Sequence, residues 1–130
     1  MGDGHLNLRD CLKTERVGSV EGWLLDEQTV YLRFHAQEVT LDEIHESRNV
    51  RVALVGNEKE YRCLTDVRAV RSATAEARRF PPHGTTQRLA ILYGSPVGRM
   101  IGNAYLRIRP PHCPTKLFAD ESKAMEWLKA

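Results

Sequence analysis

Three glycines spaced four residues apart form the part of this sequence that most resembles a chemical motif. They are Gly94, Gly98 and Gly102 in the segment LYGSPVGRMIGN, residues 92–103. A Walker A loop binds phosphate through GxxxxGK followed by serine or threonine, but Arg99 stands here where the lysine should be. The spacing also differs from the GxGxxG of dinucleotide sites and from the G-x-S-x-G of hydrolase nucleophile turns. The segment therefore predicts none of these three kinds of site.

The same segment has the pattern of a helix start. Ser95 is a favourable N-cap, and Pro96 suits the first helical position because its nitrogen needs no hydrogen bond there. Apolar residues then recur at helical spacing and predict an amphipathic helix over residues 96–109. Glycine inside a helix costs roughly 1 kcal/mol relative to alanine. We therefore expect Gly98 and Gly102 to form a close-packing face against the sheet, another helix, a ligand or a second copy of the chain.

The spacing of cysteines and histidines indicates neither a metal site nor a disulfide framework. Cys11, Cys63 and Cys113 are odd in number and far apart, and Cys63 lies in an apolar run where we expect it to be buried. No two of the five histidines have the spacing that places both on one helix face. We expect no metal, no cofactor and no enzymatic activity. Ser95 or Cys113 as a hydrolase nucleophile is an alternative, although neither has a visible base.

The composition is that of an ordinary globular domain. The chain has 130 residues, which suits one domain, and 42% of them are hydrophobic. The net charge of +2 is far below the basic excess of a dedicated nucleic-acid-binding protein, so nucleic acid is not an expected partner. No stretch of 18 apolar residues and no apolar leader occur, so we expect no membrane span and a cytoplasmic location.

Hydrophobic periodicity predicts an α/β domain. Residues 1–15 are polar and patternless, so we expect a flexible tail followed by a single domain over residues 16–130. Alternating apolar residues on both sides of a short turn predict an N-terminal β-hairpin, and the strands that follow alternate with helices. This order favours a mixed, mostly parallel sheet of about five strands with four helices. The expected strands cover residues 16–25, 29–36, 61–67, 88–94 and 115–119, and the expected helices cover residues 40–55, 74–80, 96–109 and 120–130.

The first predicted helix has a clear start and an imperfect apolar face. Thr40 and Glu43 form a capping box, in which each side chain bonds a backbone N–H at the position of the other. Gly56 provides the stop. The residues expected to form its apolar stripe are Leu41, Ile44, Val52 and Val55.

Polar residues collect where the predicted central strands end. Ligands of open α/β sheets bind beyond these strand ends, and arginines near a helix N-terminus suit an anion. The predicted anion- or partner-binding rim consists of Asp66, Arg68, Arg71, Ser72, Thr74 and Ser95. The alternative is that Thr74 and Ser95 are only N-caps and that Asp66 is only a turn residue.

Three segments together resemble a known family. LTDVRAVRSAT opens a helix after a strand, RLAILYGSPVGRMIGNAYLR follows, and PTKLFADESKAMEWLK lies close to the end of the sequence. Over residues 20–130 this pattern resembles the small bacterial STAS/SpoIIAA-like proteins, which are distantly related to anti-sigma factor antagonists and to CRAL-TRIO lipid-carrier domains. The resemblance implies a SpoIIAA-like α/β fold and a bacterial source. Most proteins with this pattern have no assigned activity.

The phosphorylation site of antagonist STAS domains is not matched. Those domains place a phosphorylatable serine or threonine after two aspartates at the start of a helix. Aligning Asp66 with the first aspartate places Arg71 on the second and Ala73 on the acceptor. Ser72 and Thr74 flank that position, but the acceptor hydroxyl is missing. The alignment therefore leaves a phosphoswitch without its acceptor.

Two functions follow as hypotheses. The resemblance, together with the lack of a catalytic constellation, favours a non-enzymatic STAS-like regulatory or protein-interaction module, with a protein partner at the rim or a homodimer. The alternative is a carrier for a small-molecule or lipid-like apolar ligand, with a pocket beneath the helix at residues 96–109. A pocket below that helix would distinguish the two hypotheses.

Overall fold

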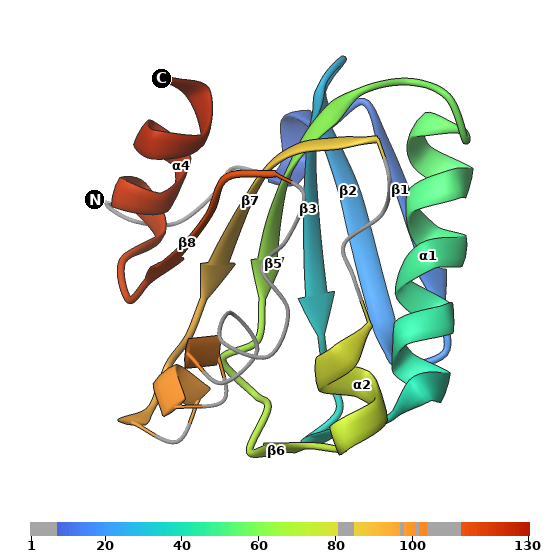
Figure 1. Ribbon diagram of the computed structural model, residues 1–130. Coiled ribbons are helices and arrows are strands. Elements are labelled where there is room, and N and C mark those ends of the chain that lie inside the picture. Colours follow the sequence, from blue (N-terminus) through green and yellow to red (C-terminus); the bar gives the residue numbers. More distant parts are fainter. Residues whose placement is uncertain (1–7, 81–84, 97, 101, 104–112) are drawn as a thin grey trace.

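A mixed, six-stranded sheet forms the centre of the protein (Figure 1). The computed structural model describes residues 8–80, 85–96, 98–100, 102–103 and 113–130. Within these residues the strand order is β1-β2-β3-β5-β7-β8, antiparallel from β1 to β3 and parallel from β3 to β8. The strands are β1 (Lys13–Val17), β2 (Val20–Asp26), β3 (Thr29–Phe34), β5 (Tyr61–Asp66), β7 (Thr86–Leu92) and β8 (Thr115–Phe118).

The predicted α/β class, the N-terminal hairpin and the mostly parallel sheet are confirmed. The sheet is larger than the five strands expected, because β1 adds an edge strand next to β2. Residues 13–15 of the expected tail belong to β1 (Lys13–Val17), and η1 (Leu8–Asp10) precedes this strand. An edge strand is held by backbone pairing and carries mainly polar side chains, so it has no hydrophobic period to detect. Residues 1–7 lie outside the described part of the chain.

Helices cover both faces of the sheet (Figure 1). α1 (Leu41–Val55) and α2 (Ala75–Arg79) pack on one face, and α4 (Glu121–Lys129) packs on the other. Residues 98–100 and 102–103 are helical and belong to the helix predicted at 96–109, of which Val97, Ile101 and residues 104–109 lie outside the described residues. The result is a three-layer arrangement in which the sheet separates two hydrophobic clusters.

Strand alternation decides which side chains meet on each face. Val30, Leu32 and Phe34 of β3 point toward α1, whereas Tyr31 points toward the α4 side. The parallel register pairs Arg33 of β3 with Asp66 of β5. Both residues therefore lie near the carboxyl ends of their strands, at one edge of the sheet.

The start of α1 follows the prediction, and its apolar face follows it in part. The capping box is confirmed: the Thr40 backbone N–H donates to Glu43 Oε1 at 2.6 Å, and Thr40 caps the helix in return. Val52, expected in the apolar stripe, is instead 37% exposed. The buried residues of the helix are Ser47, Val50, Arg51 and Leu54. Ile44 and Val55 of the expected stripe pack against the core, but the hydrophobic pattern missed the buried positions because two of these four residues are polar.

A second, two-stranded sheet is formed by the short strands that precede α1 and α2. β4 (Glu38–Val39) pairs in parallel with β6 (Ser72–Ala73), apart from the main sheet. The sequence predicted only a connection at residues 68–73, and a two-residue strand is too short to show any periodicity. β6 leads directly to Thr74, the N-cap of α2.

Candidate functional site

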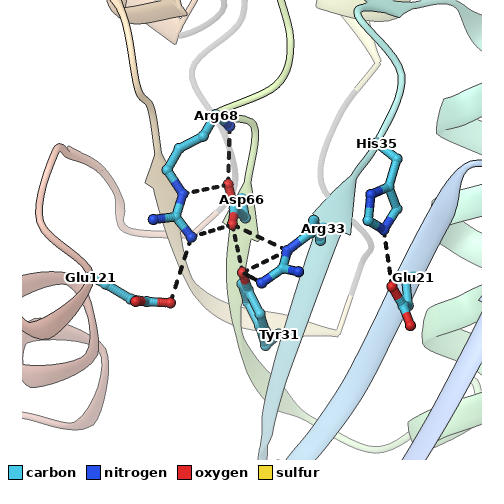
Figure 2. Close-up of polar contacts among 7 residues, drawn as sticks. All are labelled: Glu21, Tyr31, Arg33, His35, Asp66, Arg68 and Glu121. Atoms are coloured by element: carbon cyan, nitrogen blue, oxygen red, sulfur yellow. Dashed lines mark hydrogen bonds and ion pairs between the residues drawn. The ribbon is translucent and has the colours of Figure 1, made fainter. Parts of the chain in front are cut away.

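A buried carboxylate lies at the end of the central strand β5 (Figure 2). Asp66 is 2% exposed. Arg68 Nε donates to Asp66 Oδ1 at 3.0 Å and Arg68 Nη2 donates to Oδ2 at 2.7 Å, so the guanidinium binds both carboxylate oxygens. The hydroxyl of Tyr31 donates to Asp66 Oδ2 at 2.5 Å from the neighbouring strand. The carboxylate thus accepts hydrogen bonds from a β3 side chain and from Arg68, two residues beyond the end of β5.

Arg33 and Glu121 complete this group, and we call the five residues the Asp66 cluster (Figure 2). Arg33 Nη2 donates to Tyr31 Oη at 2.9 Å, and Arg33 Nε lies 3.6 Å from Asp66 Oδ2. Arg68 Nη2 lies 3.7 Å from Glu121 Oε1 of α4. The cluster therefore joins β3, β5 and α4, and its two guanidinium groups face two carboxylates.

Burial and pairing shift the pKa values in the cluster. Burial raises the pKa of Tyr31, and the hydrogen bond to Asp66 raises it further, to about 12. Burial also acts to raise the pKa of Asp66, but the hydrogen bonds from Arg68 and Tyr31 outweigh it and hold this pKa below its ordinary value of 3.8. At neutral pH the tyrosine is protonated and the aspartate is ionised. Because the charges balance internally, the arrangement is that of an ion-pair network that fastens α4 to the sheet.

A cavity of about 140 Å³ lies on the opposite face of the sheet. α1, α2 and the helical glycines Gly98 and Gly102 surround it, and strands β3, β5 and β7 contribute side chains to its wall. The lining is mostly apolar. Its described members are Phe34, Val39, Ile44, Ser47, Arg48, Arg51, Thr65, Val67, Val70, Ala73, Ala77, Arg78, Phe80, Leu89, Ile91, Gly98 and Gly102.

Arginines supply the charge in this lining. Arg48 and Arg51 come from α1, at the helical spacing that places both on the same face as Ile44. The guanidinium of Arg48 lies over the ring of Phe80, 4.4 Å from its centroid. Arg51 is buried, and its positive charge lies near the buried hydroxyl of Tyr61. Burial raises the pKa of Tyr61, whereas the charge of Arg51 acts to lower it. The cavity is therefore an apolar space with cationic side chains in its wall.

The chain matches one protein family and resembles a solved structure. A family model described as a domain of unknown function, DUF7793, matches residues 23–130. The chain belongs to the DUF7793 family. The solved structure of an uncharacterized protein of the DUF3478 family from Shewanella loihica, with a SpoIIAA-like fold, is 18% identical and has a TM-score of 0.54. The match covers 89% of this chain and 90% of that chain, and it supports the predicted SpoIIAA-like fold. No curated protein matches the chain.

The predicted rim residues of this DUF7793 domain separate into different roles. Asp66 and Arg68 are brought together, but in the Asp66 cluster. Thr74 Oγ1 accepts a hydrogen bond from the N–H of Ala77, and Ser95 Oγ accepts one from the N–H of Gly98 at 3.0 Å. Both hydroxyls therefore cap helices, which is the structural alternative stated above.

Arg71 and Ser72 belong to another part of the surface. The N–H groups of both residues donate to the carbonyl of Gln37, beside the β4–β6 pair. Both side chains are exposed, and Ser72 Oγ donates to Glu38 Oε2 at 3.5 Å. α2, which starts after this segment, packs on the cavity side of the sheet, whereas Asp66 lies on the α4 side. The rim thus does not form one continuous set of contacts in the described part of the protein.

The two helical glycines differ in how closely they pack. A Cβ atom at Gly102 would lie 2.8 Å from Leu117 Cδ2 of β8, so this glycine allows a close approach to the sheet. A Cβ atom at Gly98 would lie 3.4 Å from Ser95 Oγ, which is an ordinary contact. Both residues line the cavity.

The surroundings of Cys113 do not favour a nucleophile. Cys113 is buried, and burial raises the pKa of its thiol, which disfavours the reactive thiolate. No group of three or more histidine, cysteine, aspartate or glutamate side chains in the described ranges could hold a metal ion. In the same part of the chain, no helix has the length and apolar character needed to cross a membrane.

Sequence reasoning missed the arginines of the cavity and the strand residues of the Asp66 cluster. Arg48 and Arg51 follow Ile44 by four and seven residues, so the inward face of α1 could have been recognised once its polar members were allowed. Arg33 and Tyr31 gave no such signal, because their link to Asp66 depends on the register between β3 and β5.

Proposed function

We propose that this chain is a non-enzymatic domain that binds a small, mostly apolar molecule in the cavity beneath α1 and α2. The supporting observation is the cavity itself, which has a volume of about 140 Å³ and a mainly apolar lining. Sites for small molecules are concave and mostly apolar, with a few polar groups that orient the ligand. Here those groups are Ser47, Thr65 and the arginines.

The size of the cavity suits a single small molecule. An engineered protein cavity of roughly 150 Å³ is large enough to bind benzene. A ligand that binds only the folded protein stabilises it by mass action, so we expect ligand binding to raise the free energy of unfolding.

The Asp66 cluster is a weaker candidate for the binding site. Its arginines already face Asp66 and Glu121, so an added anion would have to displace an internal carboxylate. Its tyrosine hydroxyl already donates to Asp66. We therefore assign the cluster to the scaffold that holds the sheet and α4 together.

Two alanines of α2 provide a matched test. Ala77 is 4% exposed and lines the cavity, whereas Ala75 is exposed on the same helix and is not among the lining residues. Ala77→Leu should fill the cavity and abolish binding, and Ala75→Leu should leave binding unchanged. Binding is measured by native mass spectrometry of the purified protein, for a co-purifying molecule, and by NMR titration with toluene and indole. If no molecule co-purifies, and no ring compound, neutral or charged, shifts the amide signals of the wild-type lining residues at millimolar concentration, the proposal is wrong.

A protein-interaction module is the second candidate, favoured by an open hollow beyond the carboxyl end of β7. Ser95, Arg99 and Met100 border this hollow, and Met100 is 64% exposed. Methionine and arginine are enriched in protein interfaces. In this candidate the domain is regulatory and binds a protein partner or a second copy of the chain.

A substitution that places a negative charge at this hollow tests the protein-interaction candidate. Met100→Glu should remove a partner captured from the source cell, or should shift a dimer to monomer in sedimentation equilibrium. Val52→Glu places the same charge on the exposed side of α1 and should do neither. A monomeric wild-type protein that captures no partner contradicts this candidate.

A further inference from the structure

We infer that the ligand of the cavity is an organic anion, with its acid group at Arg48 and Arg78 and an apolar body about the size of one aromatic ring. This inference rests on the proposed function, because it assigns a chemical class to the molecule that the cavity would hold. Three observations carry it: the charge of the lining, the hydrogen-bond donors of the lining and the volume of the cavity.

The positive charge of the cavity wall is not balanced within the described lining. Among the described lining residues, three are arginine and none is aspartate or glutamate. Arg51 already interacts with Tyr61 and belongs to the buried framework. Neither Arg48 nor Arg78 has an ion-pair partner among the described residues. Next to an apolar space, where screening by water is weak, such cations favour an anionic ligand.

Arg78 offers a hydrogen-bond donor that no described residue accepts. Its Nε atom is buried and has no hydrogen-bond partner within the described part of the chain. A buried donor without an acceptor is unfavourable, so an acceptor brought by a ligand would be bound strongly. Carboxylate and phosphate oxygens are the acceptors that match guanidinium donors best.

Arg48 is held at the same junction between α1 and α2. Its guanidinium stacks on Phe80, which follows α2 and also lines the cavity. Stacking restrains the plane of the guanidinium and leaves its N–H groups available to a ligand. Arg48 and Arg78 thus belong to two helices that pack against each other, and together they can bind one acid group.

The remaining lining sets the size of the apolar body. Phe34, Leu89 and Ile91 come from the sheet. Val70 precedes β6, and Ala77 belongs to α2. The volume of about 140 Å³ is close to the roughly 150 Å³ that accepts a benzene ring. A small aromatic or branched carboxylate or phosphate monoester therefore matches this volume.

The test compares ring compounds that differ in charge. Phenylacetate and phenyl phosphate carry an acid group, phenylacetamide is a neutral analogue, and phenethylamine is a cation. Binding of each to the full chain is measured by isothermal titration calorimetry and NMR at one ionic strength. We expect at least one acid to bind about tenfold or more tightly than phenylacetamide. The acid that binds more tightly shows whether the site prefers a carboxylate or a phosphate.

Arg78→Gln and Arg79→Gln form the matched pair of variants. Both remove one charge from α2, but Arg79 is exposed and is not among the lining residues. We expect Arg78→Gln to lose most of the preference for the acid and to keep its affinity for phenylacetamide, and Arg79→Gln to resemble the wild type. Arg48→Gln provides an independent variant should Arg78→Gln fail to fold.

The outcomes separate the two proposals. If phenylacetamide binds as tightly as the acids, or if neither Arg78→Gln nor Arg48→Gln alters the preference, the anion assignment is overturned while the binding cavity stands. If no ring compound binds the wild-type protein, and toluene does not bind either, the proposed function itself is overturned.

Discussion

Replacing Asp66 with asparagine would test whether the Asp66 cluster stabilises the fold. The substitution keeps the shape of the side chain but removes the charge that Arg68 and Arg33 face. It also places an amide NH₂ group among donors, because an amide has one acceptor oxygen where the carboxylate has two. Arg68 Nε or Nη2 would then lose its acceptor.

The size of the effect follows from burial on each side of the ion pair. Removing one partner of a buried pair costs about 3–5 kcal/mol. The side chains of Arg33 and Arg68 are 36% and 39% exposed, so water would partly replace the lost carboxylate. We therefore expect a loss of about 2–3 kcal/mol in the free energy of unfolding. For a chain of 130 residues, this corresponds to a fall in Tm of roughly 10 °C.

The loss of stability in Asp66→Asn should depend on pH in one direction. The pKa of Asp66 is lowered in the folded protein from its ordinary value of 3.8. A lowered carboxyl pKa contributes stability that is present above about pH 4 and is lost as pH falls through the folded pKa. The difference between wild type and Asp66→Asn should therefore be full at pH 7 and should shrink below about pH 4.

Urea unfolding at pH 7 and at several lower pH values measures the loss in the free energy of unfolding and its dependence on pH. Glu21→Gln is the matched control, because Glu21 Oε1 pairs with His35 Nε2 at 2.9 Å in a partly exposed site (Figure 2). We expect this control to cost less than about 1 kcal/mol. A loss below about 0.5 kcal/mol for Asp66→Asn, or a larger loss that persists unchanged at pH 2.5, would refute the reasoning.

Three further predictions concern packing, capping and titration. Gly22→Ala should lower the free energy of unfolding by about 1–3 kcal/mol, because the new Cβ would overlap Val50 of α1; an unchanged urea midpoint would contradict this. Thr40→Ala removes half of the capping box with Glu43 and should cost about 1 kcal/mol in the same assay, whereas no loss would mean that the cap is dispensable. Since the raised pKa of Tyr31, about 12, lies above its ordinary 10.0, stability should hold below pH 10 and fall as pH rises toward 12. In an absorbance titration at 295 nm, Tyr31→Phe should lack a transition near pH 12 that the wild type shows, and identical curves would disprove the assignment.

Local signals in the chain were strong enough to predict most elements. The capping residue Thr40 and the alternation in β3 correctly indicated a helix and a strand. Capping and alternation depend only on residues that are neighbours in the chain, so both can be read from the sequence. The class of the fold followed from the order of these elements.

The failures share one physical cause, which is dependence on distant partners. β1 and β6 exist because other strands supply their hydrogen bonds, and their own residues have no periodic pattern. The inward face of α1 carries Arg51 because Tyr61 lies opposite it. A hydrophobic pattern cannot identify a buried polar residue whose partner comes from another element.

The segment at residues 92–103 shows the same division. Local chemistry was sufficient to exclude a phosphate loop and to identify Ser95 as a helix cap. The role of Gly102 required the tertiary structure, because its neighbour Leu117 lies on β8, a strand that comes later in the chain. The cavity itself depends in the same way on packing between α1, α2 and the sheet, since an unfilled volume belongs to no single segment.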